Sequence, residues 1–190
     1  MSAFTPSPEP ELGPEDLDAV IAGGGVSVAF QPVIDLARAS VVGYEALARF
    51  DGPVPSPLPW FEAAQRHGRL VELEAAALRS ALEAHAILPT NTFLTVNIGP
   101  GSIDTPLVRA VWDDHPSLGG VVIELTEHER IDSYTNLEPA LDRLRSAGAR
   151  LAIGGVEGEG EDATHRIPCR EPARRAPGGR ASCDTGCSRA

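Results

Sequence analysis

Two carboxylates and one carboxamide occupy similar places in three segments that are typical of β-strands. Glu45, Asn97 and Glu124 each lie inside an apolar run of this kind. The carboxyl ends of parallel strands are where ligands bind in α/β folds, so the three side chains would converge there. Their oxygens are the hard ligands that Mg²⁺ and Mn²⁺ prefer. The pattern is compatible with a divalent-metal site, but taken alone it favours the alternative, a set of solvated polar residues at strand ends.

Side-chain alternation divides each of these strands into an aliphatic face and a polar face. Successive strand residues point to opposite sides of a sheet, so Thr95 and Asn97 share one side while their aliphatic neighbours share the other. Glu45, Leu47 and Arg49 share a side by the same rule. Each strand therefore offers an aliphatic face to a helix layer, and its second face becomes polar toward the carboxyl end.

The elements that would position these residues follow from hydrophobic periodicity and from turn residues. We expect helices within 15–21, 57–68, 70–87, 106–112 and 137–147, and strands at 26–34, 41–50, 92–99, 121–127 and 149–153. The first two strands are predicted to form a hairpin. From residue 41 onward, strands alternate with helices, which indicates parallel strands with helical crossovers in an open sheet or a barrel.

Composition and charge are those of a soluble globular protein with an acidic surface. The 190 residues include 42% hydrophobic side chains, and the formal net charge is −11. That charge argues against non-specific binding of DNA or RNA and of anionic membranes, because polyphosphates need a basic surface. It is compatible with a small phosphate ligand held through a metal ion. The chain shows no signal-peptide pattern and no run of roughly 18 apolar residues, so we expect a cytoplasmic protein without a membrane partner.

Four motifs in the centre of the chain resemble, in order, those of one enzyme family. AFQPVIDLARASVVGYEALARF resembles the opening of an EAL domain, where a Q-P strand precedes G-x-E-A-L-x-R. PLPWFEAAQRHGRLVELEAAALRSAL resembles its first helical region, and VVIELTE matches its E-[IL]-T-E strand. TFLTVNIGPGSI is similar to its N-[LI]-S strand, with Gly99 where serine is usual. Each motif is weak alone, but four in order at family-like spacing are specific, and the likeness covers about residues 28–153.

The resemblance implies a fold and a reaction. The fold would be a modified (β/α)₈ TIM barrel whose first strand runs antiparallel to the rest. A barrel of this kind needs on the order of 240 residues, so this chain would form a partial barrel with its final strands missing. The reaction would be the metal-dependent hydrolysis of cyclic di-GMP to pGpG.

Site residues follow from the resemblance position by position. The implied ligands of Mg²⁺ or Mn²⁺ are Glu45, Asn97 and Glu124. The residues implied to line the substrate site are Gln31, Leu47 and Arg49, and a guanidinium suits a phosphate. A core position for Leu47 and a structural ion pair for Arg49 are the alternatives.

The likeness fails where the family carries D-D-F-G after its L-A-I strand. Those aspartates ligate and bridge the two metals of the family, whereas this chain has Gly154 and Gly155 there. The family's later K-[IL]-D strand and Q-G segment are not found. GGVEGEGED (154–162) also resembles the family's later A-E-G-V-E-T-E segment, which an internal deletion would explain. A frameshift near residue 154 is the other explanation, and both leave the site without its second metal position.

Three domains are therefore expected: a lead-in and short helix at 1–25, the N-terminal part of an EAL domain at 26–153, and a disordered tail at 154–190. The tail has only two strongly apolar aliphatics, Val156 and Ile167, and no aromatic residue, so it can bury too little surface to offset the entropy of ordering.

These features favour an EAL-domain protein that is related to metal-dependent cyclic di-GMP phosphodiesterases and is impaired in catalysis. Its expected partner is cyclic di-GMP. The alternatives are a degenerate EAL module that binds cyclic di-GMP or a protein partner without hydrolysis, and a truncated gene product without function. Relatives in the family often dimerise, so a homodimer is a further expectation.

Overall fold

The computed structural model describes residues 11–126 and 137–153. In these ranges the chain forms helices and strands in the predicted order, with small differences at their ends. The elements are α1 (Pro14–Gly23), β1 (Val26–Asp35), β2 (Ser40–Phe50), α2 (Leu58–Arg66), α3 (Leu70–His85), β3 (Phe93–Ile98), α4 (Pro106–Asp113), β4 (Val121–Leu125), α5 (Glu138–Ser146) and β5 (Arg150–Ile153).

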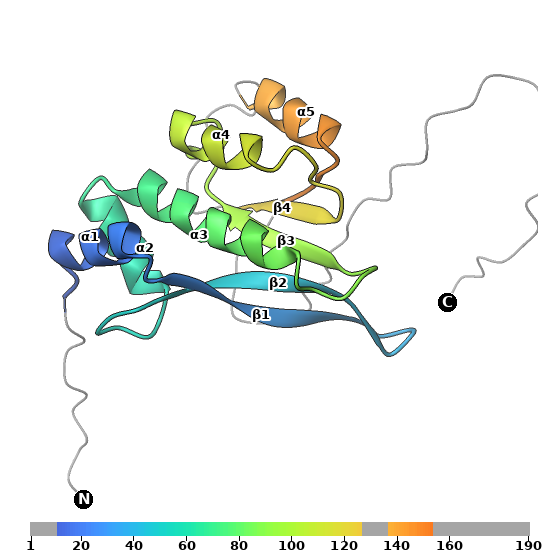
Figure 1. The fold of residues 1–190 in the computed structure, drawn as a ribbon, viewed down its shortest axis with the longest axis horizontal. Helices are drawn as coiled ribbons and strands as arrows, with labels where there is room; N and C mark the ends of the chain where they lie inside the picture. Colours follow the sequence, from blue (N-terminus) through green and yellow to red (C-terminus); the bar gives the residue numbers. More distant parts are fainter. Residues whose placement is uncertain (1–10, 127–136, 154–190) are drawn as a thin grey trace, which may run out of the picture.

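The strands form one mixed sheet in the order β1-β2-β3-β4-β5 (Figure 1). β1 and β2 pair antiparallel, and every later pair is parallel. This arrangement confirms the α/β fold with an antiparallel first strand. The parallel strands are joined by helical crossovers, as the alternation of elements from β2 onward requires.

The hairpin between β1 and β2 closes through local hydrogen bonds of Asp35. Its Oδ1 accepts the backbone N–H groups of Ala37 at 2.9 Å and Arg38 at 3.1 Å, and Oδ2 pairs with the Arg38 guanidinium at 2.7 Å. The Arg38 hydrogen bonds hold the pKa of Asp35 below its usual value. Ala39 adopts φ +47°, the left-handed conformation that completes the turn. The hairpin projects past the end of the helix layer in Figure 1.

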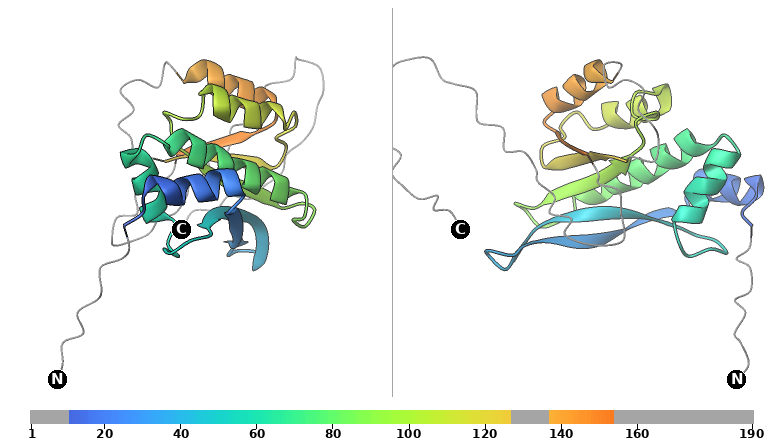
Figure 2. Two further views of the ribbon diagram at one scale, coloured as in Figure 1. Left: turned by 60° about the vertical axis from the view of Figure 1, so that its left-hand side comes forward. Right: turned by 180° about the vertical axis from the view of Figure 1, so that it is seen from behind.

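Helices cover one face of the sheet, and the main core lies between them and the strands (Figures 1 and 2). The strand residues in this core are alternate ones, as the sequence pattern predicted: Ala46, Leu94, Val96, Ile98, Val121, Ile123 and Leu125. The helices contribute small and aliphatic side chains and one tryptophan, among them Leu78 of α3, Val108 and Trp112 of α4, and Leu144 of α5. The aliphatic face of each strand is therefore buried, which leaves the polar face on the other side of the sheet.

A second core joins α1 and α2 to the end of β2. Leu17 of α1 is 0% exposed and packs with Val54 and Trp60. The Trp60 indole donates to the Val54 carbonyl at 2.8 Å, and its ring lies 5.4 Å from that of Phe50. Helix α1 is thus packed into the folded unit. In the described residues, no helix is long and apolar enough to cross a membrane.

Candidate functional site

Strand register brings Glu45, Asn97 and Glu124 to one face of the sheet. Asn97 of β3 lies directly beside Glu124 of β4, and Glu45 of β2 lies beside Thr95, which shares a face with Asn97. The Asn97 amide nitrogen Nδ2 donates to Glu45 Oε1 at 2.9 Å across the two strands. The structure therefore places the three residues of the predicted metal site next to one another, on the face opposite the helices.

The predicted substrate-site residues lie on the same face. Gln31 of β1 is exposed and pairs in register with Glu45, and Leu47 pairs with Ala29. Arg49 pairs with Ser27 near the end of β2. Because residues that are paired across strands share a face, one surface of β1 and β2 carries all the substrate contacts that the resemblance implied.

Arg49 makes its hydrogen bonds to the backbone of its own strand. One guanidinium nitrogen donates to the Ala48 carbonyl at 2.8 Å and to the Leu47 carbonyl at 3.4 Å. No ion pair between Arg49 and a carboxylate occurs in residues 11–126 and 137–153. Within that part of the chain, Arg49 is a half-buried cation whose charge is not matched by a partner carboxylate.

The donor set fits one divalent cation in its chemistry. Because Asn97 Nδ2 is bound to Glu45, the amide oxygen of Asn97 remains as a ligand atom, together with the second oxygen of Glu45. Glu124 adds a carboxylate from β4 on the other side of Asn97, so the set offers carboxylate and carboxamide oxygens, which are hard ligands. The described residues hold no group of three or more His, Cys, Asp or Glu side chains able to bind a metal. Among the described residues of this face, the carboxamide of Asn97 is the donor that lies between the two glutamates.

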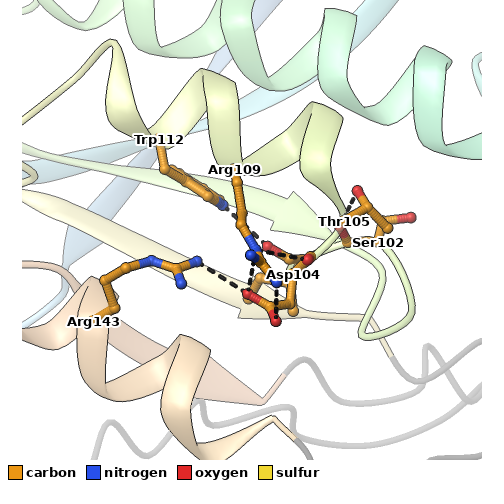
Figure 3. Close-up of polar contacts among 7 residues, drawn as sticks. Ser102, Asp104, Thr105, Arg109, Trp112 and Arg143 are labelled. Carbon is orange, nitrogen blue, oxygen red and sulfur yellow. Dashed lines mark hydrogen bonds and ion pairs between the residues drawn. The ribbon is translucent and has the colours of Figure 1, made fainter.

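A second polar cluster, unnoticed in the sequence, holds the loop between β3 and α4 (Figure 3). Asp104 accepts two hydrogen bonds from Arg109 of α4, both at 2.9 Å, and one from Arg143 of α5 at 3.1 Å. Arg109 is the main reason that the pKa of Asp104 lies below its usual range. The contact between Asp104 and Arg143 joins residues 39 positions apart, so no local pattern could have predicted it.

Several predicted features fall on residues outside the described ranges. Glu127 of the E-[IL]-T-E motif, the Gly154-Gly155 pair and the predicted tail are among them. Their contribution to the site remains a prediction from the sequence.

Comparison with known proteins identifies a family for this chain. The model of the EAL domain family matches residues 15–166, so the matched region begins in α1, ahead of residue 26. A probable cyclic di-GMP phosphodiesterase of Escherichia coli, PdeI, is 24% identical in an alignment of 146 residues that covers 68% of this chain and 18% of that protein.

Solved structures share the fold. The BlrP1 protein of Klebsiella pneumoniae, in a complex with manganese and cyclic di-GMP, is 28% identical with a TM-score of 0.54, over 68% of this chain and 34% of that one. The EAL domain of Xanthomonas citri FimX, in complex with cyclic di-GMP, has a TM-score of 0.57 and 22% identity over 73% of this chain and 58% of that one. The chain thus spans only part of the length of these relatives. The family model nevertheless matches most of this chain, which therefore belongs to the EAL domain family and is related to cyclic di-GMP phosphodiesterases.

Proposed function

We propose that this chain is an EAL module that binds cyclic di-GMP together with a divalent cation and is impaired in hydrolysing it. The observation that carries the proposal is the hydrogen bond of 2.9 Å between Asn97 and Glu45, which brings together two of the proposed cation ligands from adjacent strands. Glu124 completes the set from β4. Mg²⁺ or Mn²⁺ bound there would supply a positive charge that offsets a phosphate and the two glutamates.

Arg49 supports the nucleotide part of the proposal. Its guanidinium lies on the same face as the metal-binding residues, and within the described residues its only hydrogen bonds go to backbone carbonyls. A charged group in that position gains from a phosphate ligand, because a guanidinium matches two phosphate oxygens with parallel hydrogen bonds. Gln31 and Leu47, on the same face of β1 and β2, would contact the rest of the nucleotide.

Hydrolysis is impaired in this proposal because the chain has no carboxylate side chains directly after β5. Gly154 and Gly155 follow β5, where the resemblance expects two aspartates that ligate and bridge the metals. Glycine has no side chain with which to bind a cation. One metal position supported by three ligands can hold a nucleotide, but in-line phosphodiester hydrolysis in two-metal sites uses both cations.

The proposal is tested by measuring binding and turnover separately on the full chain. Isothermal titration of cyclic di-GMP in Ca²⁺ and in Mn²⁺ is expected to show saturable binding, while chromatography of the same samples shows no pGpG. Arg49→Gln is expected to weaken binding about tenfold or more, because it removes a charged phosphate contact. Arg38→Gln is the matched control, because Arg38 is an exposed hairpin arginine paired with Asp35, and it is expected to leave binding unchanged.

Two outcomes would overturn the proposal. Formation of pGpG that disappears in Glu45→Ala would show an active hydrolase, in which other carboxylates such as Glu157 or Glu159 replace the aspartates. Absence of nucleotide binding by folded wild-type chain would exclude a nucleotide-binding module.

A further inference from the structure

Helix α3 carries a carboxylate on the stripe that it buries against the sheet. Glu74 is half-buried, and residues one and two helical turns further on, at Leu78, Ala81 and Leu82, are 2–5% exposed. Its oxygen Oε2 is itself buried. A carboxylate on an apolar stripe costs free energy unless hydrogen bonds compensate, so such a residue is expected to have a specific partner.

One such partner of Glu74 is the backbone where β3 ends. Glu74 Oε1 accepts the N–H of Gly99 at 3.0 Å, across 25 residues of sequence. Gly99 is the residue after the last residue of β3, Ile98. A hydrogen bond from a backbone N–H to an ionised carboxylate is stronger than one between neutral groups.

The absence of a side chain at position 99 is what permits this contact. A Cβ at Gly99 would lie 2.9 Å from Glu74 Oε1, closer than real Cβ atoms come to other atoms, and 3.3 Å from Oε2, which is a tight contact, so the Glu74 carboxylate would have to shift. Gly99 does not have a positive φ angle, so the conformational freedom of glycine does not explain its presence. The close approach of the Glu74 carboxylate accounts for a residue without a side chain at this position.

The hydrogen bond between Glu74 and Gly99 lies two residues after Asn97 in the sequence. The Gly99 carbonyl accepts the N–H groups of Ser102 at 3.0 Å and Ile103 at 3.2 Å, so Gly99 begins the turn that leaves the sheet. The far end of this loop is held differently, by the bonds of Asp104 to Arg109 and Arg143 (Figure 3). Glu74 thus fixes the start of the loop, and Asp104 fixes its end.

We propose that Glu74 is a positioning residue for the metal site. By holding the Gly99 N–H it sets where β3 ends, and thereby keeps the Asn97 amide directed at Glu45. The Mn²⁺-binding test of this inference rests on the function proposed above. A second readout, taken without metal or nucleotide, tests the geometry independently.

The first experiment titrates the full chain with Mn²⁺ and follows unbound Mn²⁺ by electron paramagnetic resonance. Glu74→Ala removes the acceptor, and Gly99→Ala displaces it from the opposite side. Both are expected to raise the Kd for Mn²⁺ about tenfold, or ~1.4 kcal/mol. Glu74→Gln keeps an oxygen of the same reach and is expected to stay within about threefold of wild type, because only the charge of the acceptor is lost. Asp104→Asn is the matched control at the other end of the loop, and its expected Kd is that of wild type.

The second experiment records the Asn97 side-chain NH₂ and Gly99 amide resonances in labelled, metal-free chain. Both are expected to shift in Glu74→Ala, and the Asn97 resonances are expected to shift in Gly99→Ala, while the Asn97 signal stays in place in Glu74→Gln and Asp104→Asn. If the Asn97 resonances of folded Gly99→Ala and Glu74→Ala match wild type, Glu74 is a structural residue only, and the inference is wrong. If the resonances shift as expected but wild type binds no Mn²⁺, the proposed function fails while the link from Glu74 to Asn97 stands.

Discussion

At the scale of single residues, the side chains of the candidate site are arranged specifically but contribute little to the stability of the fold. Asn97 is exposed and Glu45 is half-buried, so their hydrogen bond contributes little to folding, since exposed polar contacts exchange readily with water. Glu45 and Glu124 lie on the strands to either side of Asn97, and a cation bound among these side chains would offset the charge of both carboxylates. The arrangement therefore favours ligand binding more than stability.

Glu45→Gln tests this balance at the residue that links the strands. Loss of one negative charge is expected to change the free energy of unfolding by no more than about 0.5 kcal/mol, the usual range for surface substitutions. The same change is expected to weaken Mn²⁺ binding at least tenfold, because the cation loses an ionised ligand. Urea unfolding and Mn²⁺ titration measure the two quantities. A large loss of stability with unchanged Mn²⁺ affinity would contradict this division of roles.

His85 gives the chain a pH dependence that can be assigned to one residue. Partial burial at the end of α3 lowers its pKa from the usual 6.5. The unfolded chain therefore takes up a proton at a higher pH than the folded chain does. Stability is expected to be unaffected above about pH 6.5 and to fall as the pH drops through that value toward the lower folded pKa. Urea unfolding from pH 8 to 5 checks this. His85→Gln is expected to show a smaller loss over the same interval, and equal losses in the two proteins would exclude His85 as the cause.

At the scale of elements, Asp104 joins α4 to α5. The three residues of this cluster are 37–47% exposed at their side chains, so each ion pair is worth little, about 0.2–1 kcal/mol. Asp104 nevertheless makes contacts with both helices at once.

Asp104→Asn is accordingly expected to lower the free energy of unfolding by about 1 kcal/mol at low salt. High salt screens exposed charges, so the difference from wild type should shrink at 1 M NaCl. Asp142→Asn is the control, because the ion pair that Asp142 makes in the described part of the chain lies within α5, with Arg145 three residues on, and a smaller loss is expected. Equal effects of the two substitutions in chemical unfolding would mean that Asp104 does not tie the helices together.

Helix α1, which the sequence predicts as a short helix ahead of the first strand, packs into the second core. Leu17 is 0% exposed in the second core, so Leu17→Ala would leave a cavity. We expect it to lower the free energy of unfolding by about 2–5 kcal/mol, as buried leucine truncations do. Leu36→Ala is the matched control, because Leu36 is 90% exposed on the hairpin turn, and no measurable change is expected. A loss below about 1 kcal/mol for Leu17→Ala in urea unfolding would show that α1 contributes little to the stability of the fold.

At the scale of the whole molecule, charge sets the long-range conditions for ligand capture. The net charge of −11 opposes the approach of cyclic di-GMP, each of whose phosphodiesters is negative. Salt shortens the range of this repulsion to about 10 Å at 0.1 M. Association of the nucleotide in the absence of divalent cations is therefore expected to become faster as NaCl is raised from low concentration. Stopped-flow rates at several salt concentrations measure this, and rates that fall steeply with salt would reveal a locally basic entrance instead.

The sequence by itself determined the elements and the face on which the site lies. The order of helices and strands follows from short-range periodicity, because burying alternate strand residues or one helix stripe requires only neighbours in sequence. The alternation around Glu45 and Asn97 predicted correctly that both would lie opposite the helix layer. The four motifs indicated the family that the comparison confirmed.

Only the tertiary structure decided which residues from distant segments touch. The hydrogen bond of Glu74 to Gly99 and the contacts of Asp104 join positions that follow no local period, and a glutamate in a helical segment is typical of a solvent-exposed face. The packing of α1 depends likewise on the end of β2 and on α2, which come later in the chain. Periodicity shows which face a residue takes, whereas its partner depends on how the chain closes over long separations.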